Sequence, residues 1–265
     1  FAFLLPAFLV SMQKPEIFFT YWWPLSYYQG TPQAFDYYHS LTVTTKLGLI
    51  FFFFSLFMFF IAAPILTYFF GKRWYCSWVC GCGGLAETSG DAFRQLSDKS
   101  LKAWKIERWM IYSVLVLVVA MTSLLWLNVA TGRSVLGPAS ENFYKTYSFL
   151  IGSAFSGVIG VGFYPIFGSR VWCRFGCPMA AWLGIWQRKA SKFRITTNGG
   201  QCISCGNCST YCEMGIDVRA YAQQGQDILR ASCVGCGICS AVCPRGVLRL
   251  ENAAGDVFER AAEKD

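Results

Sequence analysis

Residues 47–70, LGLIFFFFSLFMFFIAAPILTYFF, form a run of 24 residues without a single charge. The run is apolar on every helical face and long enough to cross a bilayer, which takes about 20 residues. Two further uncharged runs, 109–130 and 147–167, are of similar length, and the apolar stretch 1–12 is a shorter candidate for the first span. We therefore expect an all-α membrane helical bundle with about four transmembrane helices and a kink at Pro64.

Charged residues are few and unevenly placed. They make up 14% of the 265 residues, against roughly 25% in a soluble domain. Thirteen basic residues follow the second and fourth spans, and four lie on the opposite side. Because basic flanks stay in the cytoplasm, we expect a multi-pass protein of the inner membrane with its C-terminal part on the cytoplasmic side. Arg73, Arg170 and Arg174 are interpreted as membrane-surface anchors, with tuning of a nearby cluster as the alternative.

The same distribution argues against nucleic acid as a partner, because the basic residues border apolar spans and form no compact basic soluble module. The chain also contains 13 cysteines. They cluster at metal-ligand spacings, which favours metal sites in a reducing compartment over the disulfides of a secreted protein.

Two cysteine runs in the C-terminal part carry the clearest motif. Residues 202–212 (CISCGNCSTYC) and 233–243 (CVGCGICSAVC) share the spacing C-x2-C-x2-C-x3-C at an offset of 31 residues. In bacterial two-cluster ferredoxins the fourth cysteine of each run ligates the other cluster. We therefore predict two [4Fe–4S] clusters, one held by Cys202, Cys205, Cys208 and Cys243, the other by Cys233, Cys236, Cys239 and Cys212.

Structural zinc is the alternative for these eight thiols. Zinc sites with four cysteines usually combine two separated pairs, whereas these thiols fall into two tight quartets, which favours the clusters. The first run departs from the second at Glu213, which stands where the second run has Pro244, but no ligand is lost. We predict a transmembrane domain over residues 1–195 and a small α+β ferredoxin domain over 196–265.

A second internal match follows the apolar spans. GKRWYCSWVCGCGG (71–84) aligns without a gap with GSRVWCRFGCPMAA (168–181), and the copies share a glycine, an arginine, an aromatic residue and two cysteines. Each copy follows an apolar span with a proline near its end. Free cysteines that recur by chance would not bring these neighbours along. We therefore expect a duplicated helical hairpin with both cysteine pairs at the same membrane depth.

Together with the double ferredoxin motif, this layout resembles the NapH/NosR class of membrane polyferredoxins. That class has hairpins with CxxxCP motifs and a cytoplasmic two-cluster ferredoxin domain. CRFGCP at 173–178 matches the motif, whereas CSWVCG at 76–81 has Gly81 in place of the proline and is followed by Cys82. The resemblance implies electron transfer between the quinone pool and a respiratory reductase.

The duplicated cysteines suggest a further metal site. Two CxxxC pairs supply the four thiolates that a cluster needs. We hypothesise that Cys76, Cys80, Cys173 and Cys177 together bind a third metal or iron–sulfur centre at the cytoplasmic edge of the membrane. The alternative is buried free cysteines, which are common in apolar surroundings; a cytoplasmic disulfide is disfavoured.

The sequence shows no dinucleotide fingerprint, P-loop, catalytic triad or HExxH motif, so we assign no catalytic residues. We expect a subunit of a respiratory complex that transfers electrons between a quinone or quinol and a partner redox protein. An assembly or maturation factor for a metalloenzyme such as a terminal oxidase is the alternative. His39, the only histidine, is a candidate proton acceptor from quinol on the outer face, against the simpler interpretation of a solvated residue.

Overall fold

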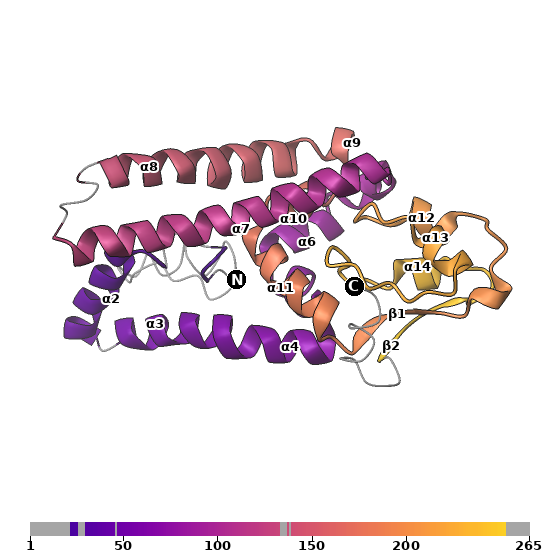
Figure 1. The fold of residues 1–265 in the computed structure, drawn as a ribbon, viewed down its shortest axis with the longest axis horizontal. Coiled ribbons are helices and arrows are strands. Elements are labelled where there is room, and N and C mark those ends of the chain that lie inside the picture. The colour runs from indigo at the N-terminus through magenta and orange to yellow at the C-terminus, as the bar shows by residue number, and fades with distance from the viewer. Residues whose placement is uncertain (1–21, 26–29, 46, 133–136, 138, 253–265) are drawn as a thin grey trace.

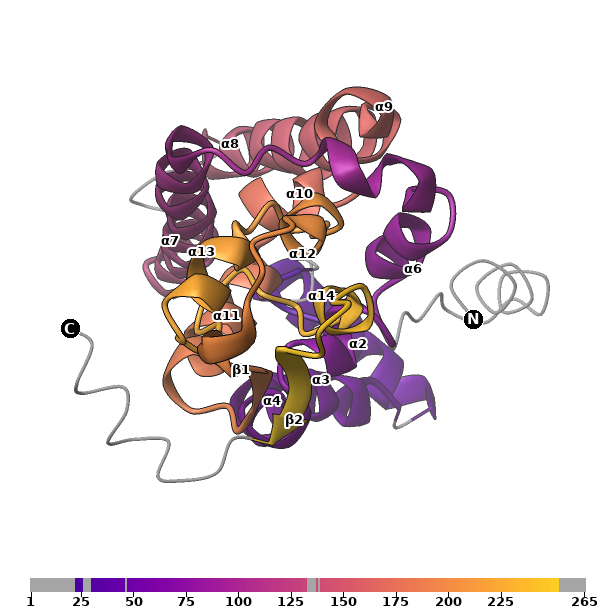
Figure 2. The ribbon, with the colours of Figure 1, turned by 90° about the vertical axis from the view of Figure 1, so that its right-hand side faces the viewer.

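The computed structural model describes residues 22–25, 30–45, 47–132, 137 and 139–252. The apolar stretch 1–12, predicted as the first span, lies outside them. Three long helical rods follow the long axis of the molecule, and the elements of the C-terminal part gather at one end of the rods (Figure 1). Seen from that end (Figure 2), the C-terminal elements lie between α7 (Leu101–Ala130) on one side and α4 (Ala63–Phe70) on the other.

The first rod is formed by the uncharged run 47–70. Its elements are α3 (Leu47–Phe57), the π-helical segment η2 (Met58–Ala62) and α4. The helix α2 (Pro32–Thr45) precedes this rod. Pro64 lies in the first turn of α4; it has no amide hydrogen to donate, and its ring crowds the carbonyl four residues earlier. The π-helical segment lies directly before this proline, and the kink predicted at Pro64 stays a prediction.

The other two rods are α7 and the helix formed by α8 (Ala139–Tyr147) with the π-helical segment η4 (Ser148–Gly162). The Ser100 hydroxyl caps α7 by accepting from the amide of Ala103 at 3.1 Å, which satisfies a donor left free at the helix start. Of the described residues, Phe52–Phe70 and Leu101–Ala130 form the two helices that are long and apolar enough to cross a membrane.

The predicted span 147–167 is helical as far as Gly162 and then breaks at Phe163. The helix restarts as α9 (Tyr164–Phe167), with Pro165 in its first turn. Three of the four predicted spans are therefore helical in the described part of the chain.

The duplication predicted from the sequence is present in the backbone. After α4 come α5 (Arg73–Cys76) and α6 (Gly81–Glu87); after α9 come α10 (Val171–Phe175) and α11 (Pro178–Lys189). Gly71 and Gly168 end α4 and α9 with φ of +64° and +90°, a region that favours glycine. The same hydrogen bond, from a cysteine amide to the carbonyl five residues earlier, closes both loops: Cys80 to Tyr75 (2.8 Å) and Cys177 to Trp172 (3.0 Å).

The C-terminal part is small and contains a second internal repeat. Its elements are β1 (Phe193–Thr197), η5 (Gly199–Gln201), α12 (Asn207–Thr210), α13 (Val218–Gln223), α14 (Ile238–Ala241) and β2 (Leu248–Asn252). Gly206 and Gly237 start α12 and α14 with φ of +85° and +82°. The two strands pair antiparallel, with Ile195 opposite Leu250, so the chain before the first cysteine run closes against the chain after the second.

One apolar core continues from the helical part into the C-terminal part. Trp74 and Leu183 belong to the same cluster of buried side chains as Ile195 and Ile216. The predicted boundary between residues 195 and 196 falls inside β1, and it remains a prediction. Burial of shared apolar surface holds the cysteine loops and the ferredoxin-like part against each other.

Candidate metal centres

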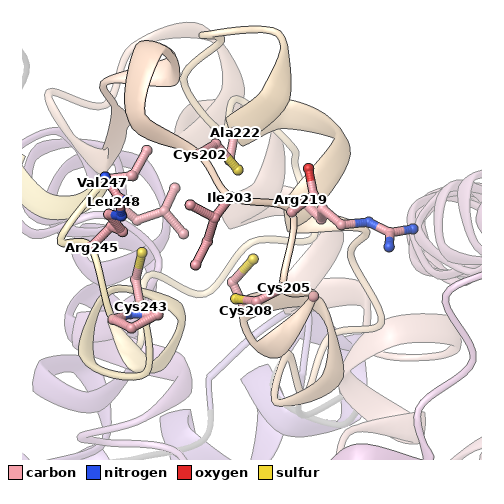
Figure 3. Close-up of a pocket in the computed structure, with 13 residues that line it drawn as sticks. Cys202, Ile203, Cys205, Cys208, Arg219, Ala222, Cys243, Arg245, Val247 and Leu248 are labelled. Atoms are coloured by element: carbon pink, nitrogen blue, oxygen red, sulfur yellow. The ribbon is translucent and has the colours of Figure 1, made fainter.

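The first predicted quartet lies around one pocket. Cys202, Cys205 and Cys208 come from the first run and Cys243 from the second, and all four line this pocket (Figure 3). The remaining walls are largely apolar, including Ile203. The fold therefore places Cys243 of the second run beside three cysteines of the first; ligation of one cluster by these four residues remains a prediction.

Backbone amides surround the sulfur of Cys243. Burial opposes ionisation of this thiol, but the amides of residues 245–248 donate towards it and hold its pKa below the ordinary value. Amide donors of this kind stabilise the negative charge of thiolates around iron–sulfur clusters. Four thiols, apolar walls and amide donors suit a [4Fe–4S] cluster.

The second predicted quartet is likewise drawn together, because each of these thiols interacts electrostatically with at least one other. Its members are Cys212, Cys233, Cys236 and Cys239. Burial, with smaller contributions from neighbouring charged groups, raises the pKa of Cys212 and Cys233 to about 11 and that of Cys236 to about 12. The amide of Ile216 donates to the sulfur of Cys212 at 3.4 Å. Burial keeps these thiols protonated when no metal is bound. Binding to iron would release the protons, so this quartet also suits a cluster.

The duplicated CxxxC loops bring a third group of thiols together. Cys76, Cys80, Cys173 and Cys177 are all buried, and Cys177 interacts electrostatically with the other three. Burial raises the pKa of Cys76 to about 12. The two pairs, 97 residues apart in the sequence, thus converge as the duplication predicted.

Cys82 is a fifth thiol in this group. It hydrogen-bonds with Cys80, which lowers the pKa of Cys80 to about 7, and it lies within electrostatic range of Cys173 and Cys177. The sequence marked Cys82 only as a departure from the second copy, where Met179 stands at the matching position. That departure was the one available signal that Cys82 joins the group.

Over the described ranges, no three His, Cys, Asp or Glu side chains converge as the ligands of a single metal ion do. The thiolates of a cubane cluster lie further apart than those of a single ion, because four irons and four sulfides separate them.

A buried arginine joins the third group of thiols to the ferredoxin-like part. Arg170, 1% exposed, donates from Nη1 to the carbonyl of Cys76 at 2.9 Å. Its Nε lies 3.2 Å from Glu213 Oε2 and its Nη2 lies 2.7 Å from Glu87 Oε1. Burial alone would lower the pKa of Arg170, but Glu213 together with the thiols of Cys173 and Cys76 outweighs burial and raises the pKa. Glu213, which stands where the second run has proline, is therefore the partner of an arginine beside the third group of thiols.

Arg174 makes a second buried connection. Its Nε donates to Glu107 Oε2 at 2.7 Å and its Nη1 to the carbonyl of Asp98 at 2.7 Å. The interpretation of Arg170 and Arg174 as membrane-surface anchors is thus wrong. Carboxylates distant in the sequence compensate both charges in the interior, which local sequence could not show.

His39 lies far from the thiols. It is exposed on α2, and α2 lies at the end of the molecule opposite the C-terminal part (Figure 1). A role for His39 in proton transfer remains a prediction.

Two family models match the chain. One, described as a 4Fe-4S binding domain, matches residues 48–100 and 150–196, and the other, described as a 4Fe-4S dicluster domain, matches residues 201–248. The first model thus matches both copies of the cysteine hairpin, and the second covers both cysteine runs. No solved structure matches the chain.

Curated relatives match over more than half of this chain. YccM of Escherichia coli (strain K12) is 29% identical over 56% of the chain, and the regulatory protein NosR of Stutzerimonas stutzeri is 29% identical over 63%. The protein NirI of Paracoccus denitrificans is 26% identical over 60%. The matched regions span 43%, 22% and 24% of the lengths of YccM, NosR and NirI. With these relatives, and with 4Fe-4S family models on both its hairpins and its cysteine runs, the chain belongs to the NapH/NosR-type family of polyferredoxins.

Proposed function

We propose that this chain is a membrane-bound electron-transfer subunit that works between the quinone pool and a partner redox protein in a respiratory complex. A [4Fe–4S] cluster, when bound, exchanges single electrons. The name of the relative YccM refers to electron transport, which supports this class of function. The observation that carries the proposal is the convergence of two CxxxC pairs beside the ferredoxin-like part, with Arg170 in electrostatic range of both Cys76 and Cys236.

Three sets of thiols would hold the centres. The first cluster would be held by Cys202, Cys205, Cys208 and Cys243, the second by Cys212, Cys233, Cys236 and Cys239, and a third centre by Cys76, Cys80, Cys173 and Cys177. The third set is supported by the matched backbone of its two halves. Cys80 and Cys177 each have an extended backbone, and each directly precedes a helix.

The buried charges of the chain suit such centres. Arg170 places a cation among thiolates, which offsets the negative charge that gathers when four thiolates share one site. Glu213 and Glu87 in turn neutralise Arg170, so the arrangement does not bury an unpaired charge when the thiols are protonated.

The proposed location is the inner membrane, with the ferredoxin domain on the cytoplasmic side. The two long apolar helices support a membrane location, and the excess of basic residues at the thiol end of the spans supports the orientation. A reporter protein that is active only in the cytoplasm is expected to be active when it is fused after residue 252.

Iron and sulfide analysis of the purified protein tests the third centre. Two cubane clusters supply roughly eight irons per chain and a third would bring this to roughly twelve. We expect Cys76→Ser and Cys173→Ser to lower the content to roughly eight. Cys82→Ser tests the fifth thiol of the group separately, because it lowers the iron content only where Cys82 is itself a ligand. Roughly eight irons in the unaltered protein, with no loss in either variant, would exclude the third centre.

An assembly or maturation factor remains the second candidate, because such a protein would use the same clusters to reduce a metal or a thiol. Turnover with a quinol analogue, together with stable co-purification of catalytic subunits, is expected for the electron-transfer subunit. Reduction of copper or of a disulfide without any reaction with quinol would favour the maturation factor.

A further inference from the structure

A cavity of about 1050 Å³ lies outside the three thiol groups. Its walls come from the first turns of α7, from α11, and from the loop that precedes Cys233. This volume is at the upper end of the range for small-molecule sites, which is about 300–1,000 Å³. No residue on its walls belongs to the thiol groups described above.

The cavity is polar at one end and apolar at the other. Four cations, Arg108, Arg188, Lys189 and Arg230, line it, together with the acids Glu107 and Asp227. Glu107 is neutralised by its ion pair with Arg174 at 2.7 Å, so the lining carries a positive excess. The remaining walls include Ile111, Tyr112 and Ile185.

Three buried donors on the walls have no hydrogen-bond partner among the described residues. They are Nε and Nη2 of Arg230 and Nε1 of Trp186. The guanidinium of Arg230 also lies over the ring of Trp104, with Cζ 4.9 Å from the ring centroid, which fixes the orientation of its planar group. Two adjacent N–H groups of an arginine match two oxygens of a phosphate, and a buried donor without a partner is costly. The site is thus built for an oxyanion.

The boundary between the two ends of the cavity coincides with the start of the apolar run on α7. Arg108 directly precedes the uncharged residues 109–130, and Ile111 and Tyr112 follow it. A ligand that fills the cavity must therefore be anionic at the level of Arg108 and apolar beyond it. Basic pockets at this level, next to membrane-spanning helices, bind the headgroups of anionic lipids.

We propose that this cavity binds an anionic phospholipid, with the phosphate on Arg230 and Trp186 and an acyl chain along Ile111, Tyr112 and Ile185. The lipid would connect α7 and α11 to the loop before Cys233. The proposal rests on the proposed membrane location but is independent of electron transfer.

Lipid binding to the purified, cluster-containing protein in a neutral detergent tests the proposal. Native mass spectrometry would count bound phosphatidylglycerol, with phosphatidylcholine as the zwitterionic probe. We expect phosphatidylglycerol to bind at least about tenfold more tightly, and Arg230→Gln to weaken its binding about tenfold, as the loss of a charge-assisted hydrogen bond does. Arg249→Gln, which removes an exposed cation of β2, is the matched control and should bind like the unaltered protein.

Arg108→Gln gives a second readout if Arg230→Gln disturbs the loop before Cys233. The visible absorption of the clusters shows whether each variant retains them, and Arg108, exposed on α7, should not affect them. Equal binding of the two lipids, or unchanged binding in both variants, would overturn the proposal. Displacement of the lipid by inorganic phosphate at equal concentration would also overturn it, because the site would then bind a soluble anion. Displacement by a neutral quinone analogue would overturn it as well.

Discussion

Arg170 and Glu213 form an ion pair in the interior of the protein, with Nε and Oε2 3.2 Å apart and both residues 1% exposed. Arg170 lies in the second CxxxC copy, three residues before Cys173, and Glu213 directly follows Cys212. The pair therefore connects the loop of the second CxxxC copy with the loop that carries Cys212, which we propose as a ligand of the second ferredoxin cluster.

The Arg170→Gln variant should be strongly destabilised. Removal of one partner leaves a buried charge uncompensated, which costs about 3–5 kcal/mol. Glu213→Gln should cost less, because Arg170 keeps Glu87 as a partner. Thermal and denaturant unfolding in detergent would measure both. Arg94→Gln is the control, because its pair with Asp91 is on the surface and contributes about 1 kcal/mol or less. Equal effects of Arg170→Gln and Arg94→Gln would contradict the buried pair.

Serine variants should sort the ferredoxin cysteines into two sets that cross the two runs. Cys205→Ser and Cys243→Ser should perturb one and the same cluster, because both residues line one pocket. Cys212→Ser and Cys236→Ser should perturb the other. Electron paramagnetic resonance of the reduced protein would resolve which signal changes. If Cys243→Ser instead altered the signal that Cys236→Ser alters, each run would bind its own cluster.

Gly168→Ala should be clearly more destabilising than Gly132→Ala. Both glycines have positive φ, +90° and +63°, but Gly168 also has a ψ of 170°, a combination almost restricted to glycine that costs other residues about 1–3 kcal/mol. At Gly168 an added Cβ would in addition meet Oγ of Ser97, and the Ser97 amide nitrogen at 2.8 Å, whereas at Gly132 no described atom lies within 4 Å. The difference between their unfolding temperatures reports this backbone strain together with the packing of the second copy against Ser97. Equal losses would show that this contact is not important.

The cluster-free protein should lose stability as pH rises from 9 towards 11. Burial raises the pKa of Cys212 and Cys233 from 9.0 to about 11, so the folded chain retains protons that the unfolded chain releases. This contribution to stability is complete below pH 9 and falls by at most about 1.4 kcal/mol per pH unit for each thiol. Denaturant unfolding at a series of pH values would measure it. A free energy of unfolding that stays constant through pH 11 would contradict the burial of these thiols.

Motif spacing was enough to predict how the cysteines group. The offset of 31 residues predicted that Cys243 joins Cys202, and the aligned copies predicted that Cys76 and Cys173 converge. Both predictions depend on short-range geometry that recurs in each copy, such as the glycine with positive φ before α12 and before α14. Local geometry of this kind is determined by neighbouring residues.

The positions of the charged residues could not be predicted in the same way. Arg170 and Arg174 follow an apolar run, and by sequence alone they resemble surface anchors. Their partners Glu213 and Glu107 lie 43 and 67 residues away, and only the tertiary fold brings them together. The close approach of α10 to the predicted span 147–167 is likewise a feature of the tertiary fold: a Cβ added at Gly160 would meet Cβ of Trp172 at 2.7 Å.

The matched loops around Cys80 and Cys177 have a consequence for the ancestry of this protein. A site built from two copies of one hairpin is complete only when two hairpins face each other, so two identical chains could have formed it as a homodimer. Joining the copies in one chain removed the need for them to stay identical. Gly81 and Cys82 in one copy, and Pro178 in the other, are among the positions at which the halves differ, so the two sides of this thiol group are not equivalent.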